Sequence, residues 1–509
     1  GLRALWGTLS LDFRDACLYV LFLGLFCTTT FGARSSNAYF TTKSLDDSFF
    51  SSTFALDKTF YDIGGRGEVF AWLNSTFLPA FLPVDSHGSL SNFVDDGNAV
   101  RVGLARIRLV RVEADSCSLP SAIPNITRCY SGIGGNAEAT GSFHGYLWQS
   151  TKALGNPSIT SVETGVTYPG SGFAIDIPNN STAAQALLEG LRNATLLDQS
   201  SRALFVDFNT YNPNVNMFSV VTTMIELLPA GAVMPSVIFR VSPLLRVRMV
   251  LGGEAGAHDT AWLALEMILY FAVLCLIAKD GKRMMRQGWR TYLGSSAWRI
   301  LDAINYAVFL AVIILRIMSV ASVESVYDDL DKQHQYTNMI GVANASISVD
   351  NLNAFNAVLC TVRFFNVARA HKGLAQFTDT LGRAGGDLFL LLVVVCVVLS
   401  GYAIGFQLGF GNSVHAYRTF LDSALTLFRA LLADFDFAAI RDTNRFLGPL
   451  LFTSFIVVVF FVVLSMFLAI VTGSYDAVMH KFSMEEDTGP IQRDMMRLGD
   501  LLSQWCKTA

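Results

Sequence analysis

The sequence has few charged side chains for its length. Asp, Glu, Lys and Arg make up 15% of its 509 residues, whereas a soluble domain usually has about 25%. Hydrophobic residues make up 52%. These values exclude an ordinary soluble enzyme and a disordered chain. The formal net charge of −4 also argues against a nucleic-acid partner.

Catalytic and metal-binding motifs are missing as well. The sequence contains no G-x-S-x-G nucleophile elbow, no H-E-x-x-H zinc motif and no CxxC pair. The glycine-rich stretch at residues 64–67 is not followed by the Lys-Ser/Thr pair of a phosphate-binding loop, so we interpret it as a turn. We therefore predict that the protein is not an enzyme and requires no cofactor.

Long hydrophobic runs are what the sequence does have. A helix that crosses a membrane needs about 20 mostly apolar residues, and six stretches approach this requirement. They are residues 16–31, 261–278, 300–320, 355–370, 388–410 and 447–471. The fourth stretch is the weakest, because it contains Arg363 and Arg369. We predict an integral membrane protein with six transmembrane helices.

The segment between the first and second runs has a different character. Eleven of the 13 prolines fall within it, which is typical of a folded domain with many turns. Alternation at residues 106–109 predicts a strand with one solvated face, whose arginines form either a subunit contact or, less favoured, a polyanion site. Residues 183–191 predict an amphipathic helix capped by Asn180 or Ser181.

Charges in the loops predict the orientation in the membrane. The loop at residues 279–299 carries six basic residues against one acid, whereas acids dominate the loop after the third run (Glu324, Asp328, Asp329, Asp331 and Asp350). Basic loops stay in the cytoplasm, which places the large domain outside and both termini inside. The glycosylation sequons agree, since all of them fall in predicted outer segments: Asn74, Asn125, Asn179, Asn180, Asn193 and Asn344.

The cysteines fit this orientation. Of the eight cysteines, only Cys117 and Cys129 lie in the predicted outer domain. An oxidising compartment favours a disulfide between them. The chain begins at Gly1 rather than Met, so we expect the natural protein to extend further at its N-terminus.

The segment at residues 411–446 carries the functional hypothesis. Residues 416–432 have apolar side chains at helical spacing but are too few and too polar to cross a membrane, and Asp434 follows them. This pattern predicts a re-entrant pore hairpin, because non-helical backbone at membrane depth needs surrounding protein or water. The alternative is an outer loop with a surface helix; the segment's aromatic residues weigh against it (Phe420, Phe428, Phe435 and Phe437).

One hairpin cannot enclose a pore, so we expect a homotetramer in which Asp434 side chains form a ring. Such a ring would select cations over anions. A secondary transporter is the less favoured alternative, because no inverted repeat is visible.

Several motifs resemble the polycystin subfamily of TRP channels. They are SCSLP (residues 116–120), FVDFNTYNPNVNMF (205–218), FRALLADFDF (428–437) and NRFLGPLLFTSFIVVVFFVVLSMFLAIV (444–471). The resemblance implies a non-selective, calcium-permeable cation channel that also passes sodium and potassium. It further implies a voltage-gated-like channel fold with an extracellular α/β polycystin domain, and a homotetramer or a heteromer with a larger polycystin.

The resemblance also implies roles for individual residues. The selectivity filter would be Leu432, Ala433 and Asp434, where Asp434 contacts the permeating cation, and Asp436 would lie at the filter mouth. The lower gate would be Leu468 and Thr472. The voltage-sensor-like charges would be Arg363, Arg369 and Lys372. The alternative for these arginines is a fixed ion pair with Glu266 or Asp302.

Together these arguments divide the chain into five parts. They are a first helix with the segment before it (1–33), the polycystin domain (34–256), a voltage-sensor-like domain (257–372), a pore domain (373–480) and a cytoplasmic tail (481–509). From the resemblance we expect a ciliary, flagellar or plasma membrane, or the endoplasmic reticulum. The remaining alternative is a receptor-like or channel-forming partner in a heteromeric complex.

Overall fold

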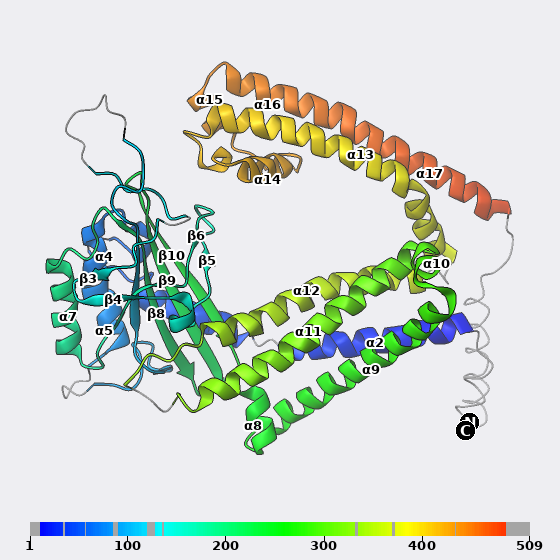
Figure 1. The fold of residues 1–509 in the computed structure, drawn as a ribbon. Helices are drawn as coiled ribbons and strands as arrows, with labels where there is room; N and C mark the ends of the chain where they lie inside the picture. Colours follow the sequence, from blue (N-terminus) through cyan, green and yellow to red (C-terminus); the bar gives the residue numbers. More distant parts are fainter. Residues whose placement is uncertain are drawn as a thin grey trace. The chain divides into compact units, whose positions relative to one another are not determined.

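The computed structural model describes most of the chain (Figure 1). The described residues are 11–33, 36–55, 57–84, 90–119, 128–134, 137–330, 334–368, 372–432 and 434–484. The chain divides into two compact units, one formed by Phe22–Leu359 and the other by Gly1–Leu21 with Cys360–Ala509.

An antiparallel sheet forms the centre of the unit Phe22–Leu359. Its strands lie in the order β10-β9-β8-β2-β7-β4-β3, and β1 pairs with β8. The strands are β1 (Val100–Arg101), β2 (Arg106–Arg111), β3 (Ser142–Phe143), β4 (Tyr146–Gln149), β7 (Gly172–Asp176), β8 (Ser201–Asn212), β9 (Met217–Leu227) and β10 (Val233–Ser242). A separate short hairpin consists of β5 (Ile159–Thr160) and β6 (Thr167–Tyr168). The three longest strands follow one another in the sequence, and each pairs with the next: β8 with β9, and β9 with β10.

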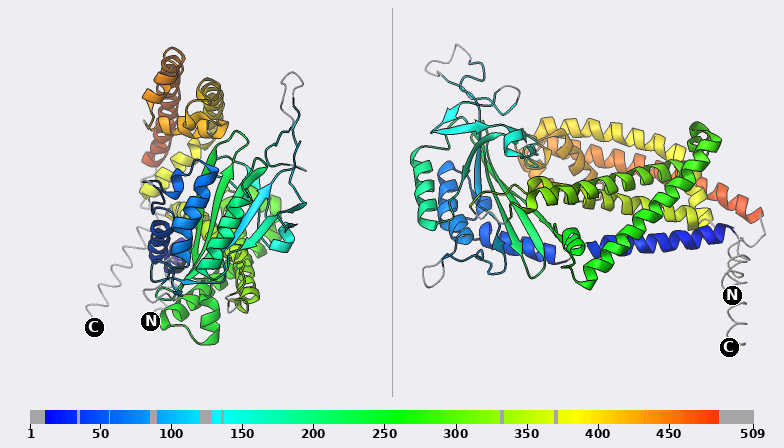
Figure 2. Two further views of the ribbon diagram at one scale, coloured as in Figure 1. Left: turned by 90° about the vertical axis from the view of Figure 1, so that its left-hand side faces the viewer. Right: turned by 60° about the horizontal axis from the view of Figure 1, so that its bottom comes forward.

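One face of the sheet is apolar. Successive strand residues point to opposite faces, and alternate positions of β8 (Leu204, Val206 and Phe208) are fully buried in one hydrophobic core. Helical segments cover this face (Figures 1 and 2). They are α3 (Asn37–Phe49), η1 (Phe60–Asp62), α4 (Arg66–Trp72), η2 (Leu73–Phe77), α5 (Leu78–Phe81) and α7 (Ser181–Asn193). Aromatic rings join the two layers, as where Phe49 and Phe208 lie 4.9 Å apart.

The amphipathic helix predicted at residues 183–191 is confirmed as α7. The Asn180 side chain accepts a hydrogen bond from the backbone N–H of Ala183, as expected of a helix cap.

The prediction of a solvated strand face at residues 106–109 is wrong. In β2 the side chain of Arg108 is only 1% exposed. It donates hydrogen bonds to the carbonyls of Pro169 and Ser171 and lies over the Phe205 ring. The alternation of charge with apolar residues therefore reflects an internal polar layer, in which arginine satisfies buried backbone carbonyls. That position is open neither to solvent nor to a polyanion.

A buried carboxylate attaches the β5–β6 hairpin to the sheet. Glu226 on β9 is fully buried and accepts hydrogen bonds from three hydroxyls of the hairpin, those of Ser161, Thr164 and Tyr168. Burial and this carboxylate raise the pKa of the Tyr168 phenol.

Further helices lie before or after the sheet in the sequence. Four of them belong to this unit: α8 (Arg246–Gly252), α9 (Ala257–Gln287), α10 (Trp289–Gly294) and α11 (Ala297–Tyr327). Two others, α2 (Leu11–Ala33) and α12 (Ile340–Ala368), continue into the second unit. The indole of Trp262 on α9 donates to the carbonyl of Thr29 on α2 at 2.9 Å, and Phe26 packs edge-on against Phe309 of α11 at 5.7 Å.

The end of α12 nearest the sheet is tied to it by polar contacts. Arg240 of β10 donates to Asn344 at 2.6 Å, and the hydroxyls of Ser242 and Ser346 share a hydrogen bond of 2.6 Å. Just before α12, the Thr337 carbonyl accepts a hydrogen bond from Asn209 of β8. The sheet and the first turns of α12 therefore form one connected piece.

The described part of the chain has five helical segments long and apolar enough to cross a membrane: Ala16–Phe49, Ala257–Gln287, Trp298–Tyr327, Leu374–Phe410 and Leu447–His480. The described part of the fourth predicted run is helical, as part of α12, but it is not among the five, because asparagines and Arg363 interrupt its apolar surface. The acids predicted in the loop before it are partly helical instead: Glu324 lies in α11 and Asp350 in α12.

The second unit contains the predicted pore segment. Its elements are α13 (Lys372–Phe410), η3 (His415–Tyr417), α14 (Phe420–Ala430), α15 (Phe437–Thr443), α16 (Leu447–Val457), the π-helical turn η4 (Val458–Val463) and α17 (Leu464–Met484). Helix α13 runs beside α16 and α17 (Figures 1 and 2).

Candidate functional site

The predicted hairpin helix is present but shorter than predicted. Residues 416–432 contain the short turn η3 and then α14, because Thr419 interrupts them as a helix cap. The Thr419 hydroxyl accepts a hydrogen bond from the backbone N–H of Asp422 and donates one to its carboxylate. The hydrogen bond from Thr419 lowers the pKa of Asp422, and Arg418 adds to the effect. This reciprocal cap fixes where α14 begins.

Helix α14 is held between α13 and α16 by one apolar cluster. Leu427 and Ala430 of α14 are buried against Phe406 of α13 and Phe455 of α16. Gly448, at the start of α16, permits a close approach: a Cβ there would lie 2.8 Å from the carbonyl oxygen of Ile440. The hairpin is thus packed on both neighbouring helices.

The chain turns back after α14 around Arg429. Its carbonyl accepts hydrogen bonds from the backbone N–H groups of Leu432 and Asp434, at 2.9 and 3.2 Å. Its guanidinium donates through Nε and Nη2 to Oδ2 of Asp434, at 2.8 and 2.6 Å. Both side chains are mostly exposed, at 65% and 61%. The predicted acidic residue is therefore paired with an arginine of its own hairpin.

Sequence reasoning missed Arg429. The available signal was a basic residue five positions before an acid across a predicted turn, where backbone reversal brings the two together.

The other predicted filter residues have different environments. The Leu432 side chain is 76% exposed, and Ala433 lies outside the described residues. Asp436 is the N-cap of α15, where its carboxylate accepts a hydrogen bond from the Ala439 N–H at 3.1 Å. Its carboxylate therefore has a local structural role in addition to the predicted place at the filter mouth.

The aromatic residues of the hairpin are partly covered. Phe435 and Phe437 both pack on Phe452 of α16, with ring centroids 4.6 and 5.3 Å apart. Phe420 and Phe428 on α14 are exposed within the single chain, at 43% and 55%. The first pair joins the turn to α16, and the second pair leaves an apolar surface on α14.

The predicted gate residues lie on one helix. Leu468 and Thr472 are both on α17, one turn apart, and both are exposed in the single chain. The π-helical turn η4 precedes α17. Such turns often occur at functional sites, since an extra residue in one turn rotates the helix that follows.

Of the three predicted sensor charges, the structure describes the side chain of Arg363. The Arg363 guanidinium lies 5.0 Å from the ring centroid of Tyr19. Arg369 and the side chain of Lys372 lie outside the described residues. Glu266, an expected partner for the arginines, instead pairs with Arg316 of α11 at 3.3 Å.

Glu266 has a second partner on its own helix. The Tyr270 hydroxyl donates to its carboxylate at 2.7 Å. Glu266 is thus already engaged by a guanidinium and a phenol, and Arg316, not recognised from the sequence as an ion-pair partner, belongs to this intramembrane cluster.

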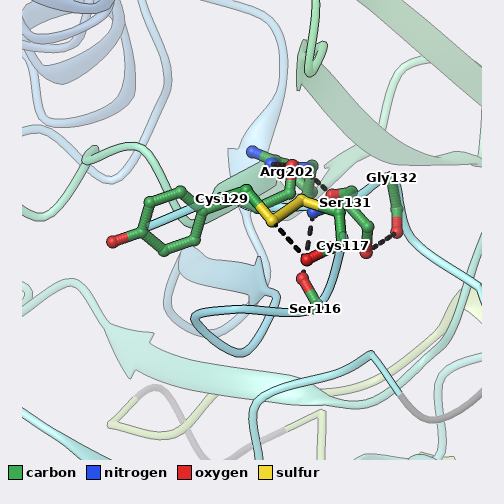
Figure 3. The surroundings of a disulfide bond; sticks show 7 residues. Ser116, Cys117, Cys129, Ser131, Gly132 and Arg202 are labelled. Carbon is green, nitrogen blue, oxygen red and sulfur yellow. Dashed lines mark hydrogen bonds between the residues drawn. A yellow bond between two sulfur atoms is a disulfide. The ribbon is translucent and has the colours of Figure 1, made fainter. Parts of the chain in front are cut away.

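The predicted disulfide between Cys117 and Cys129 is confirmed, with Cα atoms 5.7 Å apart (Figure 3). Arg202 of β8 anchors the segment after it by donating to the carbonyls of Tyr130 and Ser131, at 2.8 and 2.7 Å. The Ser116 hydroxyl accepts from the Ser131 N–H. A covalent bond and a buried arginine therefore fix the base of this loop.

The sequons differ in their surroundings. Asn193 is exposed at the end of α7, whereas Asn180 caps that helix and Asn179 is half-buried beside it. Asn74 is half-buried in η2, and Asn125 lies outside the described residues. Asn344 is bound by Arg240. Asn193 is thus exposed to solvent, whereas the exposed side chain of Asn180 is engaged as a helix cap.

Comparisons with known proteins agree with these features. A family model described as Polycystin domain matches residues 59–245, and one described as Polycystin cation channel matches residues 256–478. The first match covers the sheet and the second covers the hairpin. The chain belongs to the polycystin family. It is an integral membrane protein with the predicted combination of apolar helices and an α/β polycystin domain, and this family is not one of enzymes.

Several polycystins are similar over nearly the whole chain. Human "Polycystin-2-like protein 1" is 29% identical over 99% of this chain and 64% of its own length. Zebrafish (Danio rerio) "Polycystin-2" is 27% identical over 96% of this chain and 54% of its own. Mouse "Polycystin-1-like protein 3" is 25% identical over 88% of this chain and 20% of its own. The chain therefore spans less than two thirds of the length of these relatives.

Proposed function

We propose that the chain forms a homotetrameric, non-selective, calcium-permeable cation channel. The observation that carries the proposal is the position of Asp434. This exposed carboxylate lies in the turn between α14 and α15, within the segment matched by the polycystin channel model. Leu432 and Ala433 complete the proposed filter beside it.

The proposed mechanism is electrostatic. Four Asp434 carboxylates around one axis would replace part of the hydration shell of a cation and exclude anions. Crowded carboxylates resist full ionisation, and a cation between them relieves that cost. Calcium, sodium and potassium would all pass, and the protein would need no cofactor.

The gate would lie further along α17. Leu468 and Thr472, one turn apart, would line the pore where four copies of the helix converge. A hydrophobic constriction of this kind stops ions by excluding water. Rotation of α17 at the π-helical turn η4 would move Leu468 out of the axis.

Recordings from the purified chain in planar bilayers, under sodium, potassium and calcium gradients, test the proposal. We expect conduction by the wild type, and at least a severalfold lower calcium-to-sodium permeability ratio for Asp434→Asn. The matched control is Asp442→Asn, which removes an exposed acid of α15 that pairs with its neighbour Arg441. Equal effects of the two substitutions would contradict the assignment of Asp434, and a silent wild type would contradict a homomeric channel.

A heteromeric subunit is the second candidate. The similarity to "Polycystin-1-like protein 3" over 88% of the chain favours it. The chain thus resembles both polycystin-2-type and polycystin-1-like proteins, and subunits of similar fold could occupy equivalent positions in one complex. This candidate predicts conduction only after co-expression with a larger polycystin.

A further inference from the structure

A pocket outside the pore segment lies beside the sheet. It has a volume of about 630 Å³ and is enclosed by α8, the last turns of α11 and Tyr211 at the end of β8. Its floor includes Leu244 and Val323, both of which belong to a buried apolar cluster. Ligand pockets in proteins commonly have volumes of this size and a mostly apolar lining.

The candidate spans would place the pocket near a membrane surface. Two of its walls adjoin the ends of candidate spans: α11 ends at Tyr327, and α8 directly precedes the span Ala257–Gln287. Tyrosine is enriched at this level of membrane proteins, where its ring meets lipid and its hydroxyl meets water. A ligand here would enter from the bilayer as readily as from water.

An apolar surface extends from the pocket toward the bilayer. Leu251 in the lining is 76% exposed. Ile317, which is 65% exposed, lies seven residues before Glu324 on α11 and therefore two turns below it on the same side of the helix. An acyl chain attached to a headgroup in the pocket could follow this surface.

The charges of the lining define the headgroup. Arg248 forms an ion pair with Glu324, and its guanidinium lies 3.5 Å from the ring centroid of Tyr327. Glu254 adds a second acid. One arginine against two glutamates leaves the lining with an excess of negative charge, which repels a purely anionic headgroup. A zwitterionic headgroup is complementary, because its phosphate meets Arg248 and its ammonium meets the glutamates.

We propose that this pocket binds one zwitterionic phospholipid, phosphatidylcholine, from the leaflet on the side of the sheet. The phosphate accepts hydrogen bonds from Arg248. The quaternary ammonium lies near Glu324, Glu254 and the Tyr327 ring, which attracts cations through its π-face. The acyl chains lie along Leu251 and Ile317. The site does not involve the pore segment, so it stands or fails independently of ion conduction.

Native mass spectrometry of the full chain, purified from vesicles of equimolar phosphatidylcholine and phosphatidylglycerol, tests the site. We expect wild type to retain about one phosphatidylcholine per chain and at least fivefold less phosphatidylglycerol. Val320→Trp fills the pocket with an indole and should lower phosphatidylcholine retention at least fivefold. Ile304→Trp is the matched control, since Ile304 is an exposed residue of the same helix outside the lining.

A second pair of variants keeps the proposal testable if Val320→Trp does not fold. Arg248→Gln should lower phosphatidylcholine retention, because the phosphate loses its donor. Glu324→Gln should raise phosphatidylglycerol retention at least threefold, because an acid that repels it is gone. Equal retention of the two lipids by wild type, or wild-type phosphatidylcholine retention by Arg248→Gln, would overturn the proposal.

Discussion

Replacing Arg429 should make the proposed channel more selective for calcium. In the structure Nη2 of Arg429 lies 2.6 Å from the Asp434 carboxylate oxygen. A calcium ion bound to that oxygen at about 2.4 Å would lie within about 5 Å of the guanidinium. Arg429 therefore repels the ion that Asp434 attracts. Arg429→Gln removes this repulsion and keeps a hydrogen-bond donor.

The magnitude follows from Coulomb's law. In water, a unit charge at about 5 Å repels a divalent ion by ~1.7 kcal/mol and a monovalent ion by ~0.8 kcal/mol. The difference of ~0.8 kcal/mol corresponds to about a fourfold change in relative occupancy, and screening by physiological salt reduces it to about twofold. Because the pair is mostly exposed, its loss should change stability by at most about 1 kcal/mol.

The reversal potential under calcium on one side and sodium on the other is the measurement. Arg429→Gln should raise the calcium-to-sodium permeability ratio two- to fourfold, and Arg429→Lys, which keeps the charge, should stay near wild type. Arg441→Gln is the matched control, since Arg441 is an exposed arginine of α15 paired with Asp442. An unchanged or lower ratio for Arg429→Gln would refute the argument that this arginine weakens the filter.

Two further predictions concern the sheet and α12. Glu226→Gln should free the β5–β6 hairpin, because three hydroxyls lose a charged acceptor. We expect a loss of about 1–3 kcal/mol in the free energy of unfolding and faster proteolysis at residues 161–165, while Glu189→Gln on the exposed side of α7 should change neither. Arg363→Gln should make activation less steep with voltage, since one charge crossing the whole field contributes ~2.3 kcal/mol per 100 mV. An unchanged activation curve removes Arg363 as a gating charge.

The sequence predicted much of the fold because its strongest signals are local. A long apolar run predicts a membrane-spanning helix from its length and composition alone. Asn180 could be predicted as the cap of α7 because capping depends only on the next three residues. The pairing of Cys117 with Cys129 followed from there being no other cysteine in the predicted outer domain. None of these inferences required knowledge of distant contacts.

The features that sequence reasoning missed depend on such contacts. Arg108 looked solvated because its neighbours alternate, yet its partners are carbonyls about 60 residues away in the chain. Glu266 was one of two candidate partners in the alternative for the arginines of α12, whereas Arg316, 50 residues further along, is bound to it. Arg429 was missed although it is close in sequence, because only the turn geometry brings its side chain to Asp434. The sequence thus predicts that a buried charged residue needs a partner, but it does not identify the partner.

The ties between the sheet and the start of α12 limit how this helix can respond to an electric field. Sliding along its own axis would break the bonds of Arg240 with Asn344 and of Ser242 with Ser346 together. A helix fastened at one end can still bend or twist beyond the fastening, and Arg363 lies five turns further on. Any movement of Arg363 in response to voltage would then come from bending or rotation of the far part of α12, and not from sliding of the whole helix along its axis.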